Sequence, residues 1–178
     1  MADDIWVFGY GSLIWDPGFG FVQAQVARLD GWHRSFCMRS VHYRGTATAP
    51  GLVLALDRAA DATCHGLAFQ VTAADAVATI AYLRAREMIS DAYLEEKLPV
   101  TLADGQSVQA LTYVINRDHG QYAGVMTPDQ QSRIIAGAVG VKGDNADYLT
   151  TTAAHLARLG IADAEIDHLA TLVTQLRA

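Results

Sequence analysis

Cysteine is scarce in this chain, and so are the patterns that would give its cysteines and histidines a metal. Cys37 and Cys64 are the two cysteines among 178 residues, and they form no CxxC motif. The six histidines share no ligand-like spacing. No secretory signal pattern is present at the start. We therefore expect a reduced, cytoplasmic setting and no metal site.

Long apolar runs and clusters of basic residues are also missing. No apolar stretch approaches the ~20 residues that a membrane-spanning helix needs. The net charge is −6, and no run of lysine or arginine occurs. These absences argue against nucleic acid and against anionic membrane surfaces as partners.

What remains is an ordered globular chain, with 51% hydrophobic residues over a length that suits one domain with a real core. We therefore predict a single domain over residues 1–178. Its first half is mainly β, because short apolar runs alternate with turn-rich pieces. The expected strands are residues 5–8, 23–29, 34–40, 52–56, 66–71, 92–102 and 107–115.

Helix signals interrupt this pattern once and then dominate the last third. Thr72 is a predicted N-cap for a helix that runs to about residue 88, and Pro128 opens a second helix. A third is expected over 145–159 before Gly160, and a fourth after Asp163. The fourth has an apolar stripe at helical spacing, Ile166, Leu169, Ala170, Val173 and Leu176. The predicted fold class is α+β, with a mixed, barrel-like sheet flanked by helices.

The first candidate site follows the strand at residues 5–8. Two glycines at positions 9 and 11 let the backbone turn sharply and expose N–H groups, which form a donor nest suited to a carboxylate or phosphate. A tight turn without a ligand is the alternative. The expected anion-binding residues are Gly9, Tyr10, Gly11, Ser12 and Leu13.

Two familiar motifs do not fit these glycines. A dinucleotide fingerprint needs a third glycine where this chain has Ile14. A nucleophile elbow needs glycine on both sides of the serine, at positions that here hold Tyr10 and Ile14. We therefore do not expect Ser12 to act as a nucleophile.

The second candidate site is a misplaced carboxylate. Ala76, Ile80 and Leu83 trace the apolar face of the helix, and Glu87 is the next residue on that stripe. Burial of an unpaired carboxylate is costly. Either Glu87 pairs with Arg84 or Arg86 at a solvated helix end, or it lies in a pocket, where desolvation would raise its pKa toward that of a general base.

Several segments, taken in order, resemble one known family. They are VFGYGSLIW (7–15), GWHRSFC (31–37), RGT with PGLVL (44–54), YLRARE (82–87), ALTYV (110–114) and residues 145–149. Together they resemble the ChaC-type, glutathione-specific γ-glutamylcyclotransferases. The match extends from the first residues to about Gly160.

The resemblance implies a γ-glutamylcyclotransferase-like α+β fold and an enzyme without metal or organic cofactor. Such enzymes cleave glutathione to 5-oxoproline and cysteinylglycine. Residues 10–13 would hold the γ-glutamyl end of the substrate, Glu87 would be the general acid/base, and Tyr113 and Tyr148 would line the pocket. One segment departs from the family pattern, RDHGQYAG (117–124), so the residues that recognise cysteinylglycine stay open. Arg39 and Arg44 are candidates for its carboxylate.

Two other functions stay open at this point. The chain could be a cyclotransferase for other γ-glutamyl peptides or amines, with the same residues. It could also be a non-catalytic regulatory binding protein linked to cation transport. A base at position 87 favours an enzyme, because binding of a zwitterion does not need one.

Overall fold

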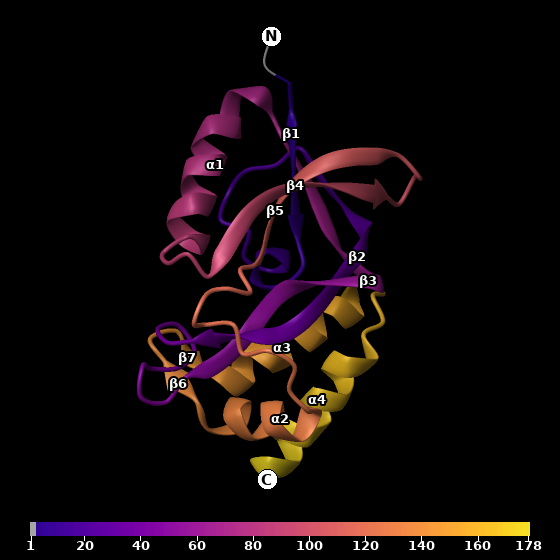
Figure 1. Cartoon of the computed structure of the whole chain (residues 1–178). Coiled ribbons are helices and arrows are strands. Elements are labelled where there is room, and N and C mark those ends of the chain that lie inside the picture. Colours follow the sequence, from indigo (N-terminus) through magenta and orange to yellow (C-terminus); the bar gives the residue numbers. More distant parts are fainter. Residues whose placement is uncertain (1–2) are drawn as a thin grey trace. The chain divides into compact units, whose positions relative to one another are not determined.

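A mixed β-barrel holds the N-terminal strand in place. The computed structural model describes residues 3–178. Its strands β1 (Ile5–Gly9), β3 (Gly51–Val71), β2 (Gln23–Ser40), β4 (Tyr93–Leu102) and β5 (Ser107–Ile115) are neighbours in that order, and β3 also pairs with β5 (Figure 1). β1 is antiparallel to β3 and parallel to β5. Trp6 and Val7 of β1 pair with Ala110 and Leu111 in the middle of β5.

The described residues group into two units. One combines the residues up to Arg34 with Leu56–Asn116, and the other combines Ser35–Ala55 with Arg117–Ala178. The barrel pairs whose register is known lie in the first unit. The single domain over 1–178 stays a prediction. The α+β class and the barrel-like mixed sheet are confirmed.

Two of the predicted strand breaks are wrong, because β2 and β3 are long and continuous. Gly31 has φ 84° but lies inside β2. Residues 57–65, which separate two of the expected strands, are extended and mostly half-buried or exposed in β3. Contacts between β2 and β3 hold them there. The Arg58 guanidinium stacks 4.9 Å from the Trp32 ring, and the Thr63 hydroxyl donates to Asp30 at 3.0 Å.

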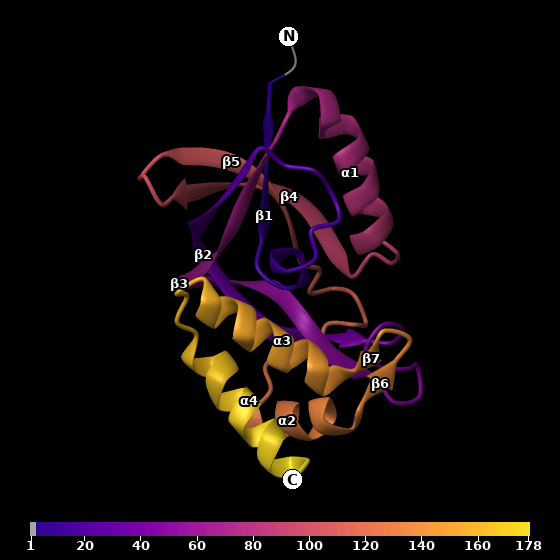
Figure 2. The same ribbon diagram turned by 180° about the vertical axis from the view of Figure 1, so that it is seen from behind.

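Helix α1 (Ala73–Glu87) begins and ends as the sequence predicts. The Thr72 side chain accepts a hydrogen bond from the Asp75 amide, which satisfies one of the helix's free N–H groups. Ala76, Thr79 and Leu83 are buried along one face. In both views the helix runs alongside the barrel strands of its unit (Figures 1 and 2). Glu87 is its last residue.

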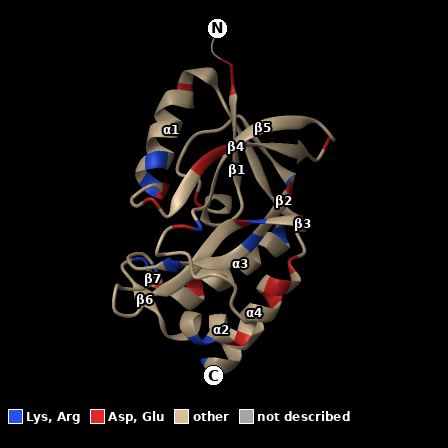
Figure 3. Ribbon diagram, in the orientation of Figure 1, with Lys and Arg blue, Asp and Glu red and all other residues tan. Residues whose placement is uncertain are grey.

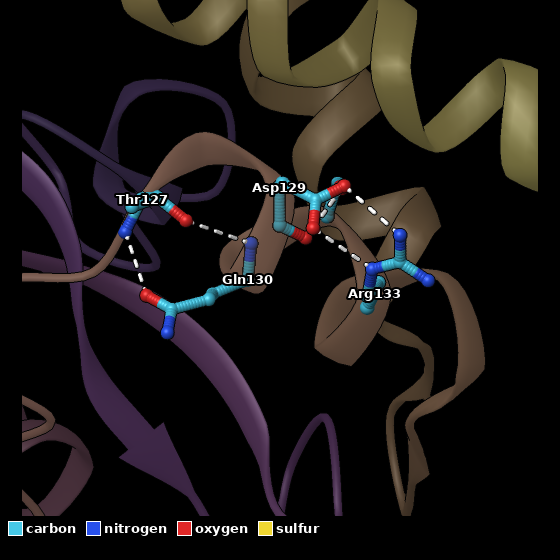
Figure 4. A network of polar contacts seen from close by, with 5 residues as sticks. Thr127, Asp129, Gln130 and Arg133 are labelled. Carbon is cyan, nitrogen blue, oxygen red and sulfur yellow. Dashed lines mark hydrogen bonds and ion pairs between the residues drawn. The ribbon is translucent and has the colours of Figure 1, made fainter.

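The second unit is built on α2 (Pro128–Gly137), α3 (Asn145–Arg158) and α4 (Ala164–Leu176), which pack on one another. Thr127 and Gln130 form a reciprocal capping box at the start of α2, and Asp129 pairs with Arg133 one turn later (Figure 4). A small hairpin, β6 (Val139–Gly140) with β7 (Gly143–Asp144), joins α2 to α3.

The apolar stripe on α4 is confirmed except at its end. Ile166, Leu169 and Val173 are buried, and the Asp163 side chain caps the helix. Leu176, the last residue of the helix, is 47% exposed. None of the helices within residues 3–178 combines the length and apolar character that a bilayer span requires.

Candidate active site

The segment after β1 forms a single short turn. Its 3₁₀ helix, η1 (Ser12–Ile14), is closed by bonds from the Ile14 amide to the Gly11 carbonyl and from the Asp16 amide to the Ser12 carbonyl, each 2.9 Å. A Cβ atom at Gly9 would lie 2.9 Å from the Leu13 Cβ. Glycine is therefore required at position 9 because the turn folds back closely onto the strand.

Tyr10 is held by hydrogen bonds at both its side-chain hydroxyl and its backbone carbonyl. Its hydroxyl donates to the carbonyl of Tyr113 at 2.7 Å, across to β5. Its own carbonyl accepts a 3.2 Å bond from Arg34, whose Nη1 also donates to the carbonyl of His65 at 2.6 Å. Arg34 is only 5% exposed. A buried guanidinium thus lies directly under the turn and gives it a positive electrostatic environment.

Glu87 lies where the helical stripe predicts it. Its side chain is 17% exposed, and its Oε1 lies 3.3 Å from the Nε of Arg86, which is 12% exposed. The pairing with Arg86 is therefore confirmed, and the carboxylate is also mostly buried. A pocket that raises the pKa of Glu87 stays a prediction. Arg84 pairs with a different residue, Glu95 of β4.

Arg86 joins the two predicted sites. Its Nη2 donates to the Ser12 hydroxyl at 3.1 Å while its Nε faces Glu87. Its Nη1 donates to the carbonyl of Asp16 at 2.6 Å. The turn after β1 and the end of α1 therefore share one guanidinium, although 74 residues separate Ser12 from Arg86.

A second carboxylate borders the same region. The hydroxyl of Tyr113 donates to Glu95 at 3.1 Å, and Arg84 binds both oxygens of Glu95. The Arg84 hydrogen bond holds the pKa of Glu95 below its usual value. Burial, with the charges of Glu95 and Glu87 nearby, raises the pKa of Tyr113 well above its usual value. Tyr113 is therefore a neutral hydrogen-bond donor next to two carboxylates. Figure 3 shows basic residues at the end of α1 and acidic ones on β4.

Comparison with known proteins identifies the family of this chain. A family model described as ChaC-like protein matches residues 5–178. The chain belongs to the ChaC-like protein family.

Two curated relatives of this ChaC-like chain align with it over nearly its whole length. The glutathione-specific γ-glutamylcyclotransferase of Escherichia coli is 35% identical over 174 residues, which cover 98% of this chain and 74% of the relative. The glutathione-specific γ-glutamylcyclotransferase 1 of Danio rerio is 31% identical, over 98% of this chain and 89% of the relative.

A solved structure confirms the fold. The γ-glutamyl cyclotransferase specific to glutathione from yeast superposes with a TM-score of 0.89 at 23% identity, over 98% of this chain and 97% of that one. At this identity the likeness supports the fold and not the substrate.

Hydrogen bonds and charges link most of the predicted site residues of this ChaC-like protein within the first unit. The linked residues come from the turn at 9–13, from the end of α1 and from β5. Tyr148 lies in the second unit. Its hydroxyl accepts a bond from the Leu54 amide at 3.3 Å, its ring packs edge-on against Phe36, and Arg44 stacks on its face. Its role in a pocket stays a prediction, as does that of Arg39.

Arg44 has a visible task of its own in the second unit. Its Nη1 donates to the carbonyl of Asp144 at 3.0 Å. Its guanidinium therefore holds the start of α3, so a role in binding the substrate's carboxylate would come in addition to this one.

The sequence missed two residues of the site region, Arg34 and Glu95, and it named Arg84 and Arg86 only as possible partners of Glu87. Arg34 and Arg86 lie inside segments that carry the family resemblance, and that was the available signal. Glu95 gives no signal in the sequence, because its place beside Tyr113 depends on the register of β4 against β5. Within residues 3–178, no group of three or more His, Cys, Asp or Glu side chains could hold a metal ion.

Proposed function

We propose that this protein is a glutathione-specific γ-glutamylcyclotransferase, which cleaves glutathione to 5-oxoproline and cysteinylglycine. Membership of the ChaC-like family and the names of the curated relatives support this function. The single observation that carries it for this chain is the link between the turn after β1 and Glu87. A mostly buried carboxylate lies beside a turn that has a buried cation beneath it.

The reaction is an internal substitution in the substrate. Glu87 removes a proton from the α-ammonium group of the γ-glutamyl residue, because an ammonium cannot attack. The freed amine attacks the γ-carbonyl carbon, and the new C–N bond closes a five-membered lactam. The bond from that carbon to the cysteinyl nitrogen then breaks. Overall, two protons leave the attacking nitrogen and two reach the leaving one, so the proton balance closes with Glu87 as the carrier.

The turn at residues 9–13 would hold the α-carboxylate and keep the γ-glutamyl chain bent. The Arg34 guanidinium lies under the turn, so its charge favours an anion there. Because the amine and the amide belong to one molecule, holding them in an attack geometry supplies much of the rate enhancement. The reaction needs no covalent intermediate, which matches the assignment of Ser12 to positioning instead of attack.

Tyr113 is suited to orient the reacting groups. Its hydroxyl is fixed by Glu95, and it stays protonated because its pKa is raised. Because its one O–H proton is donated to Glu95, its oxygen would accept a hydrogen bond from the substrate's ammonium group. A role of Tyr148 in substrate binding rests on the family resemblance alone.

A panel of substrates tests this function. Purified protein is assayed for 5-oxoproline with glutathione, γ-glutamyl-alanine and γ-glutamyl-ε-lysine. We expect release from glutathione and at least ~100-fold lower kcat/KM for the other two, which amounts to ~2.7 kcal/mol of discrimination. Equal rates on all three would favour a general γ-glutamyl cyclotransferase. Binding of glutathione without turnover would favour a regulatory binding protein.

A further inference from the structure

We propose that Arg86 is a positioning residue that fixes Glu87 relative to the turn holding the substrate. This inference rests on the proposed function. It concerns a residue between the two predicted sites that takes no part in the proton transfer itself. Its side chain is mostly buried although it lies in the last turn of α1.

One guanidinium joins three pieces of chain. Nη2 donates to the Ser12 hydroxyl at 3.1 Å, and Nη1 donates to the carbonyl of Asp16 at 2.6 Å and to the Tyr82 hydroxyl at 3.1 Å. Nε lies 3.3 Å from Glu87 Oε1. The partners of Arg86 are thus the anchoring turn, the loop after it and the helix that bears the base.

The loop after the turn is also packed tightly against the helix. Gly18 has φ 74°, and a Cβ atom there would lie 1.9 Å from the Tyr82 hydroxyl oxygen. This close approach brings the loop onto α1, and the Arg86 bonds to Asp16 and Tyr82 fix it in that place. These contacts therefore fix the position of the turn relative to Glu87.

Arginine is required for this task because its donors point in several fixed directions. A lysine ammonium would keep the positive charge but would place all of its donors on one atom. It could not satisfy Ser12, Asp16 and Glu87 together. A misplacement of ~1 Å between a substrate and a catalytic group can cost ~100-fold in rate.

Two variants and a matched control test the proposal. We expect Arg86→Lys and Arg86→Ala to lower kcat for 5-oxoproline release by ~10-fold and ~100-fold, with KM for glutathione changed by less than ~3-fold. The control is Arg133→Ala, which removes an exposed pair with Asp129 on α2 (Figure 4) and should keep kcat within ~2-fold of wild type.

Added guanidinium provides a second measurement. At millimolar concentration it should raise the kcat of Arg86→Ala several-fold and leave wild type and Arg133→Ala unchanged. Thermal melting checks that each variant folds. If Arg86→Ala does not fold, Arg86→Lys alone decides.

The result that overturns the proposal is a folded Arg86→Lys with wild-type kcat. A loss that appears only as a raised KM would overturn it too, since it would assign Arg86 to substrate binding. If the wild-type protein itself released no 5-oxoproline, the proposed function would fail instead, so the two failures are distinguishable.

Discussion

The close contact between β1 and β3 next to the turn predicts a large loss of stability when Gly66 is replaced by alanine. A Cβ atom at this position would lie 2.3 Å from the carbonyl oxygen of Gly9 and 2.9 Å from the Phe8 ring. The Gly9 oxygen belongs to a strand paired with β3, so it cannot move without disturbing the barrel. We therefore expect Gly66→Ala to destabilise the fold by ~3 kcal/mol, the upper end of typical overpacking costs.

Gly9→Ala and Gly20→Ala are controls for the stability loss expected of Gly66→Ala. A Cβ atom at Gly9 would lie 2.9 Å from the Leu13 Cβ, a less severe overlap than the 2.3 Å at Gly66, so a smaller loss of ~1–2 kcal/mol is expected. Gly20 has nothing within 4 Å, and its replacement by alanine should cost nothing. For a chain of this size 1 kcal/mol shifts Tm by ~2–4 °C. Gly66→Ala should therefore melt ~6–12 °C below wild type. Equal Tm values for Gly66→Ala and Gly20→Ala would refute the reasoning.

Two further predictions concern stability. The Asn145 side chain is fully buried and forms 2.7 Å hydrogen bonds to both the amide and the carbonyl of Leu52. Asn145→Ala should therefore lower the free energy of unfolding, measured by urea denaturation, by ~2–4 kcal/mol. A loss below ~1 kcal/mol would contradict this prediction. Glu95 has a pKa below its usual value of 4.5, chiefly because of Arg84, so its ionised form stabilises the folded state above that pH. The stability difference between wild type and Glu95→Gln should therefore shrink as pH falls through the lowered pKa, and a difference that stays constant from pH 7 to 3 would exclude this role.

Local signals in the sequence predicted the helices well. Thr72, Pro128 and Gly160 mark helix ends through bonds or backbone angles that involve only a few neighbouring residues. The strands were harder to predict. β2 and β3 continue through Gly31 and through residues 57–65, because contacts such as Arg58 with Trp32 lie between strands and leave no local trace.

In the candidate site too, features with a local signal in the sequence were predicted, and contacts between distant segments were not. Glu87 was found because a carboxylate broke the apolar stripe of one helix, and the turn at 9–13 because its glycines follow a strand. The link between them could not be found, since Arg86 meets Ser12 only after folding brings β1 and α1 together within the first unit. Glu95 depends in the same way on its register opposite Tyr113.

The measurement that tests the central claim most directly is the rate of 5-oxoproline release from glutathione by Glu87→Gln. The substitution keeps the shape of the side chain and removes its basicity. If Glu87 carries the proton, kcat falls by ~100-fold to ~10,000-fold, while the variant still folds and binds glutathione. Equal rates for the variant and the wild type would contradict the account.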